Sequence, residues 1–325
     1  MAELVVLDVG HGSAAVLHED SAAIVVDAGP GTALLEFLER TRIAHIRAVL
    51  ISHADADHLK GLLALLAQPG IRVDAVWLNS DAAQSSRTWQ ALVFELDEVN
   101  RTRDVTFEVQ LVEGRRFQLS RNAIAEVLAP RRALAALGPG GVDADGRRIS
   151  TNTVSAVVRV EVDRKTRVLL AGDLDEVGLN HLLEVDRGLA ADVLVFPHHG
   201  GNVSASATEA QNVRFTNRLL DAVAPAGVIF SIGRVHATPR PEIVGAVRNR
   251  ESCRVMCTQM STHCATDSVL PLESEHLTDA FAVGRQRGRC CAGSMRIGDS
   301  GHEPAWEIHA AFIDRAAQTP LCRRR

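Results

Sequence analysis

The sequence predicts a four-layer αββα sandwich of the α/β (α+β) class, followed by a cysteine-rich C-terminal extension. Three observations indicate this architecture. Short apolar runs typical of β-strands form two groups along the chain, and helical patterns accompany both groups. Polar residues that could carry chemistry come directly after several of these runs. All six cysteines lie beyond residue 250. Two β-rich halves with helices outside fit such a sandwich better than a doubly wound parallel sheet.

In the first half, predicted strands and helices alternate. The strands are apolar runs at 4–9, 14–17, 23–26, 46–52, 75–79, 105–112 and 123–128. The helices have apolar residues at helical spacing and cover 32–42, 59–66 and 86–100. The third run ends in a glycine turn, Asp27 to Gly31. The fourth stops at the first histidine of the motif His53-Ala54-Asp55-Ala56-Asp57-His58, which is therefore expected on a loop between a strand and a helix.

In the second half, a glycine-rich surface loop at 138–145 precedes a second set of strands. These strands are predicted at 153–162, 167–171, 192–196 and 227–232, with a helix at 209–223. We expect residues 1–250 to form one domain. Residues 251–325 would form a Cys-rich extension packed on the same domain.

The overall composition is that of a folded protein and restricts the partners little. Hydrophobic residues make up 46% and charged residues 23% of the chain. A net charge of -5 gives no basic field, so a nucleic-acid substrate would need a local patch or metal ions to hold it. No apolar run reaches the roughly 20 residues of a membrane span, and the first residues lack an export signal. A cytoplasmic protein without membrane partners is expected.

The motif at residues 53–58 carries the strongest chemical signal. It places two imidazoles and two carboxylates within six consecutive residues, a donor set that suits Zn, Mn or Fe. Ligands packed this closely suit two metals about 3.5 to 4 Å apart. The alternative is a solvated acidic turn in which Asp55 or Asp57 caps the following helix. A cap needs one carboxylate and leaves both histidines unexplained.

With this motif the chain resembles the metallo-β-lactamase superfamily, whose HxHxDH signature occurs here with Asp at the second ligand position. It resembles more specifically the hydrolase domain of ComEC-type DNA-uptake proteins and related soluble hydrolases. Five blocks agree in order and spacing: LDVGHGSAAVL (7–17), VVDAGPG (25–31), LISHADADHLKGL (50–62), VLLAGDLD (168–175) and ADVLVFPHHGG (191–201). A weaker sixth block is FSIGRVHATPRP (230–241). The resemblance covers about residues 4–245 and implies that the domain expected at 1–250 is a metallo-β-lactamase-fold hydrolase domain.

The resemblance implies a ligand set for two divalent ions, Zn or Mn. His53 and Asp55 would bind one metal, Asp57 and His58 the other, and Asp173 would bridge both. His198 or His199 would close the second site. Asp173 and the histidine pair each follow an apolar β run, as the motif does, so all three groups can meet at one edge of the sandwich.

The chain departs from the family pattern in its first half. No histidine occurs between Leu59 and Gly172, where many members supply a further ligand to the first metal. His11 stands where the uptake proteins usually have Gln, and Ser13 replaces an acidic residue. His11 could compensate for the missing ligand, bind substrate or be an ordinary turn histidine.

Three further polar residues have either a functional or a structural interpretation. Asn152 and Ser155 resemble a polar strand start in the related hydrolases, where Asn152 could bind substrate; a capping or turn role is the alternative. His236 could bind phosphate or assist the leaving oxygen, and with Asp57 and Asp173 it completes the predicted catalytic group. It could equally be a surface residue.

The C-terminal cysteines suggest a second kind of metal site. Cys253, Cys257, Cys264, Cys290 and Cys291 could form a structural zinc site, although their spacing is not a standard CxxC pair. Reduced cysteines in a hydrophobic core are the alternative. Cys322 belongs to what looks like a frayed basic terminus.

Three functions are consistent with these patterns. The leading hypothesis is a phosphodiesterase or nuclease that uses a hydroxide bridged between two metals to cleave a nucleic acid or a nucleotide. The same chemistry could hydrolyse a carboxylic ester, a lactone or an amide. The missing histidine ligand motivates a third hypothesis, a binding or regulatory component of a multi-protein defence system with a degenerate metal site.

Overall fold

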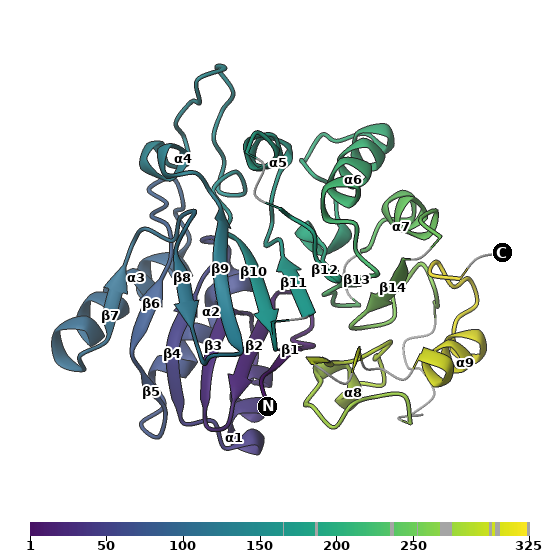
Figure 1. Cartoon of the computed structure of the whole chain (residues 1–325), viewed down its shortest axis with the longest axis horizontal. Coiled ribbons are helices and arrows are strands. Elements are labelled where there is room, and N and C mark those ends of the chain that lie inside the picture. The colour runs from purple at the N-terminus through teal and green to yellow at the C-terminus, as the bar shows by residue number, and fades with distance from the viewer. Residues whose placement is uncertain are drawn as a thin grey trace.

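Two β-sheets packed face to face form the centre of the protein, and the computed structural model describes it over residues 1–164, 166–185, 188–234, 237–251, 253–266, 275–298, 301–302 and 306–323 (Figure 1). The first sheet has the order β16-β15-β1-β2-β3-β4-β6-β7, and β5 pairs with β4. Its strands are β1 (Glu3–Val6), β2 (Ala14–Glu19), β3 (Ala22–Ala28), β4 (His45–Leu50), β5 (Arg72–Val73), β6 (Ala75–Trp77), β7 (Thr106–Glu108), β15 (Met295–Gly298) and β16 (Gly301–His302).

The second sheet has the order β14-β13-β12-β11-β10-β9-β8. Its strands are β8 (Arg116–Gln118), β9 (Ala123–Ala129), β10 (Val157–Val162), β11 (Thr166–Leu170), β12 (Val193–Val195), β13 (Gly227–Phe230) and β14 (Arg254–Cys257). The helices are α1 (Ala33–Thr41), α2 (Ala56–Leu66), α3 (Arg87–Thr102), α4 (Arg132–Leu137), α5 (Glu176–Leu183), α6 (Glu209–Val223), α7 (Pro241–Arg248), α8 (Val283–Gln286) and α9 (Trp306–Ala316), with a short 3-10 turn at Pro197–Gly200.

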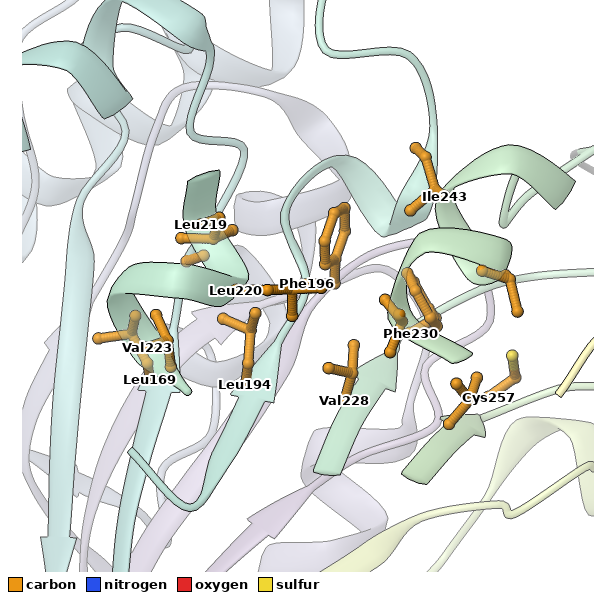
Figure 2. Packing of buried hydrophobic residues seen from close by; sticks show 14 of the residues in the cluster. Leu169, Leu194, Phe196, Leu219, Leu220, Val223, Val228, Phe230, Ile243 and Cys257 are labelled. Carbon is orange, nitrogen blue, oxygen red and sulfur yellow. The ribbon is translucent and has the colours of Figure 1, made fainter. Parts of the chain in front are cut away.

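Three separate hydrophobic clusters correspond to the three interfaces of a four-layer sandwich. Alternate residues of a strand point to opposite faces, so Leu4 and Val6 of β1 face the second sheet while Val5 packs on the helix side. Helices α1, α2 and α3 cover the outer face of the first sheet. Helices α5, α6, α7 and α9 cover the outer face of the second, where Leu219 and Leu220 of α6 are buried (Figure 2). The predicted αββα sandwich is confirmed.

The parallel strands of both sheets place the polar residues that follow them at one edge of the sandwich. β3, β4 and β6 run parallel in the first sheet, and β11 to β14 run parallel in the second. The residues that follow β4, β11, β12 and β13 carry the predicted motifs or lie next to them. Loops at the carboxyl ends of parallel strands are where such folds place their binding residues.

The C-terminal residues are built into both sheets. β14 extends the second sheet beside β13, and β15 pairs with β1 in the first. Asp8, directly after β1, is fully buried and receives hydrogen bonds from Gln259 Nε2 (2.9 Å) and the backbone N–H of Gly284 (2.8 Å). The backbone N–H of Asp8 donates to Ser294 Oγ at 2.8 Å. Gln259, Gly284 and Ser294 therefore support the loop that begins at Asp8.

Most element boundaries follow the predicted pattern, with instructive exceptions. Helix α6 has the predicted bounds, and α3 begins where Ser86 accepts a hydrogen bond from the Trp89 N–H. Helix α2 begins at Ala56, not Leu59, so the second half of the metal motif lies in its first turn and not on a loop. β10 begins only at Val157, because Ser150 and Thr153 fold the preceding residues into a hydrogen-bonded turn. None of the helices in the described residues has the length and hydropathy that crossing a bilayer requires.

Candidate metal centre

Side chains from three strand-end loops meet between the two sheets. The motif follows β4, Asp173 follows β11, and His199 lies in the turn after β12. His58 Nε2 is 3.3 Å from Asp173 Oδ1, and His199 Nε2 is 3.1 Å from Asp57 Oδ2. Residues that are more than a hundred positions apart in the sequence thus form one cluster.

The carboxylate of Asp173 divides the cluster into two sets of donors. Its Oδ2 atom is 3.6 Å from both His53 Nε2 and His198 Nδ1. Its Oδ1 atom is 3.3 Å from His58 Nε2 and 3.8 Å from His199 Nε2. A carboxylate with different imidazoles on its two oxygens has the arrangement that a bridge between two cations requires.

We call the residues around Oδ2 the first donor group and those around Oδ1 the second. The first contains His53, His198 and Asp55, whose Oδ2 is 3.5 Å from His53 Nε2. The second contains His58, Asp57, His199 and His11, and His11 Nε2 is 3.6 Å from Asp57 Oδ2. Ligand atoms of His11, Asp57 and His199 all lie within 4.8 Å of one another, as do those of His53, His58 and Asp173.

This grouping bears on two assignments that the sequence leaves open. The sequence left open which of His198 and His199 closes the second site; His199 faces the second group, and His198 lies with His53 in the first. The sequence allows His11 to replace the ligand that is missing from the first site. It lies instead against Asp57, with its ring 4.6 Å from that of His199.

The buried imidazoles fit a cation because their inward-facing nitrogens have no hydrogen bonds. The side chains of His53 and His58 are 0% and 1% exposed, and their Nε2 atoms, which face Asp173, are buried without a hydrogen-bond partner. Leaving such atoms unsatisfied costs about 1 to 3 kcal/mol each. A cation that accepts their lone pairs would remove this cost.

The charges in the cluster also favour a bound cation. Despite burial, the charges of His58, His198 and His199 hold the pKa of Asp173 well below its usual range. The pKa of His58 is raised well above its usual value, because the charges of Asp27 and Asp173 outweigh the effect of burial. Burial lowers the pKa of His198, which favours the neutral imidazole that a metal ligand needs. The carboxylates of Asp27 and Asp173 thus stabilise positive charge between the imidazoles, which is the charge that a metal ion would bring.

Residues behind the donors orient them. Asp27 Oδ2 is 2.7 Å from His58 Nδ1, and the backbone N–H of Ser52 donates to Asp27 Oδ1 at 2.7 Å. His199 Nδ1 donates to the carbonyl of Ser231 at 2.7 Å. A partner on Nδ1 selects the tautomer whose Nε2 lone pair faces inward, and such partners are typical of histidine metal ligands. Asp27 and Ser231 were not predicted as site residues from the sequence.

Asp27 provides the first test of this arrangement. Replacing Asp27 with Asn removes the acceptor that holds His58, so metal affinity should fall by about 10- to 100-fold, the usual cost of losing such a partner. Metal titration by calorimetry measures the change. The matched control is Asp20→Asn, because Asp20 has the same left-handed backbone (φ 53° against 59°) but lies in the exposed turn between β2 and β3. Equal affinities in the two variants would remove Asp27 from the site.

The turn after β12 presents two adjacent histidines by an uncommon backbone conformation. His198 and His199 have φ of 53° and 55°, in the left-handed region that costs non-glycine residues about 1 to 3 kcal/mol each. Gly200 follows with φ 73°, and a Cβ there would lie 2.5 Å from Pro239 Cβ. The backbone N–H of His198 donates to Asp173 Oδ1 at 3.2 Å, which links this turn to the bridging residue.

The remaining residues predicted from the sequence differ in how they relate to the cluster. Ser155 lies within the cluster: its Oγ accepts the Asp173 N–H at 3.0 Å and is 3.3 Å from His53 Nδ1. Asn152 accepts the Ser155 N–H through its backbone carbonyl, while its own side-chain oxygen is buried without a hydrogen bond. His236 lies outside the described residues. Gln84, which the sequence did not indicate, donates to Asp55 Oδ1 at 2.9 Å.

The five cysteines predicted as a structural zinc site do not form one group. Cys290 faces Asp8, with Sγ 3.7 Å from Asp8 Oδ2, and Cys253 is only half-buried. In the described part of the chain, no three of these thiols lie within 4.8 Å of one another.

Comparison with known proteins assigns the fold to a family. Residues 7–214, well over half of the chain, match the model of the metallo-beta-lactamase superfamily. Among solved structures, the metallo-beta-lactamase fold protein YhfI from Bacillus subtilis is 11% identical, with a TM-score of 0.47 over 78% of this chain and 96% of that one. A diphosphatase of the PhnP family is 14% identical, with a TM-score of 0.45 over 78% and 94%. Human tRNase Z, short form, is 12% identical, with a TM-score of 0.39 over 72% and 93%. No curated protein matches the chain significantly.

Proposed function

This chain belongs to the metallo-β-lactamase superfamily of metal-dependent hydrolases, and we propose that it cleaves phosphodiesters in a nucleic acid or a nucleotide at a centre of two divalent cations, Zn or Mn. The observation that carries the proposal is the division of donors by Asp173, whose two oxygens face different imidazoles. The first donor group would hold one cation and the second donor group the other. When bound, the cations would lower the pKa of a water molecule and neutralise charge on the attacked group.

The protein's own residues would supply position and access. His53 and His58 are buried, whereas the side chains of Asp55, Asp57 and His11 are 39%, 26% and 29% exposed. Substrate would therefore approach from the side of these three residues. His11 lies at the rim beside Asp57; where the second cation is held by Asp57, His58 and His199 without it, His11 Nε2 would be free of the metal and could donate a hydrogen bond to a nonbridging phosphate oxygen.

The choice of a phosphodiester over other substrates rests on the sequence blocks. The blocks at 7–17, 50–62 and 191–201 resemble those of DNA-uptake hydrolases. A net charge of -5 leaves no general attraction for a polyanion, so the cations and local donors would have to provide it. Esters, lactones and amides would be attacked by the same chemistry and are the substrates to be excluded.

The test is a substrate screen with the metal-loaded protein. Bis-p-nitrophenyl phosphate, single- and double-stranded DNA, RNA and cyclic nucleotides would be compared with a lactone, a p-nitrophenyl ester and nitrocefin, with Zn or Mn added. We expect turnover of phosphodiesters. We also expect Asp57→Ala to lower it by about 1,000-fold, since metal ions contribute several kcal/mol to such transition states.

Two results would contradict the proposal. Turnover of carboxylic substrates alone, with either metal, would replace the phosphodiester with an acyl substrate. Equal phosphodiester turnover by the wild type and by Asp57→Ala would assign the activity to a contaminant or to another site.

A further inference from the structure

Four cysteines from separate segments of the C-terminal extension line one cavity between the extension and helix α7. We call them the thiol cluster: Cys257 at the end of β14, Cys264 in the turn after Met260, Cys291 before β15, and Cys322 in the turn that follows α9. Figure 2 shows Cys257 at the end of its strand beside the core of the second sheet. The cluster shares only three residues with the five predicted from the sequence, because Cys322 replaces Cys253 and Cys290.

The cavity is small and otherwise almost entirely apolar. Besides the cysteines it is lined mainly by aliphatic side chains, among them Val244, Val255, Met260 and Ile313. The volume open to the centre of a water-sized sphere is about 10 Å³. That is room for roughly one water molecule or one ion. A core of this kind gains nothing from a bound water, because thiols are weak hydrogen-bonding groups.

We propose that the thiol cluster binds a single structural zinc ion that ties the C-terminal turn to strand β14. Zinc in structural sites is held by four ligands, commonly all thiolates, at about 2.3 Å in tetrahedral geometry. This site is separate from the His and Asp centre and does not depend on the hydrolytic function.

Two neighbouring groups support thiolate ligands at this position. The backbone N–H of Leu321 points at Cys264 Sγ, 3.5 Å away, and hydrogen bonds of this kind tune metal-bound ligands. His309 Nε2 lies 3.4 Å from Cys291 Sγ, so the tautomer with its proton on Nε2 would donate a hydrogen bond to a thiolate there.

Binding needs a small movement of the side chains. No three described thiols already lie within 4.8 Å of one another, whereas sulfurs around one zinc would be about 4 Å apart. All four cysteines line the cavity, and the proposal requires that rotation about their Cα–Cβ bonds bring the sulfurs together there. The ion would displace the thiol protons, so the cost of ionising buried thiols is met by metal coordination.

Cobalt substitution tests the proposal without interference from the catalytic centre. Thiolate ligands give Co²⁺ an intense near-ultraviolet charge-transfer absorption, which a site of imidazoles and carboxylates does not. We expect this absorption in the full-length wild type purified under reducing conditions. It should be lost in Cys257→Ser, Cys291→Ser and Cys322→Ser. Zinc analysis should show one equivalent fewer in these variants, and a thiol-specific mercurial should release that equivalent from the wild type.

The chain offers its own matched controls. Cys253→Ser and Cys290→Ser change the same chemical group within the same extension but outside the cavity, so both should keep the absorption. Because Cys322 is only half-buried, its variant is the one best able to fold if the buried substitutions are not tolerated. No absorption in the wild type, retention of the absorption in Cys322→Ser, or iron with acid-labile sulfide in place of zinc would each overturn the single-ion site.

Discussion

Replacing Asp173 with asparagine should lower kcat/KM for phosphodiester hydrolysis by about 1,000-fold or more and remove at least one divalent cation per chain. The reason is that the bound cations contribute several kcal/mol to the stability of the transition state. Asn has the same shape but no charge, and among the carboxylates of the described residues only Asp173 lies within 4 Å of imidazoles from both donor groups. Activity assays with saturating metal, together with metal analysis after gel filtration, measure the two effects.

Asp175→Asn is the matched control because it makes the same change two residues later. The Asp175 carboxylate caps α5 through the Gly178 N–H and accepts hydrogen bonds from Ser150 and Thr153, and it has no place in either donor group. We expect this variant to keep the metal and the activity, since Asn also caps helices well. Full metal content and activity in Asp173→Asn would exclude a bridging role.

Replacing Gly61 with alanine should destabilise the protein by about 3 kcal/mol, at the upper end of what overpacking of a core costs. A Cβ on Gly61 would lie 2.4 Å from the carbonyl oxygen of Gly29 and 3.0 Å from that of Ala28. Both contacts are to backbone at the end of β3, so helix α2 would have to move. Because the first turn of α2 carries Asp57 and His58, metal affinity should fall as well.

We expect the opposite result for Gly245→Ala, which makes the same change within another helix. Gly245 lies within helix α7, and a Cβ there would meet nothing within 4 Å. Alanine should therefore stabilise the protein by up to about 1 kcal/mol through helix propensity. Urea unfolding followed by circular dichroism compares the two variants with the wild type. A stable Gly61→Ala protein with unchanged metal affinity would show that α2 does not need its close approach to β3.

The sequence predicts the layers and the positions of the main donors because both depend on local patterns. Apolar runs that end in His53, Asp173 and His198 mark strand ends, and parallel strands bring such ends together. The helix at 209–223 is also local, since Thr208 and Gln211 form a capping box at its start.

The undetected parts depend on contacts between distant segments. Asp27 follows a strand and precedes a glycine turn, where an acidic residue is ordinary; its role is visible only when His58 of α2 packs against it. The assignment of His198 and His199 depends on two left-handed backbone conformations that no local pattern specifies. β14 and β15 are short strands whose pairing partners, β13 and β1, are set by the tertiary fold.

The pairing of β1 with β15 has a consequence for how the protein is made on the ribosome. Asp8, immediately before the loop of His11, receives its hydrogen bonds from Gln259 and Gly284, which are translated some 250 residues after it. Domains begin to fold during synthesis from the N-terminal side. Strand β1 can therefore pair with β15, and Asp8 can form its hydrogen bonds with Gln259 and Gly284, only after those residues have been synthesised.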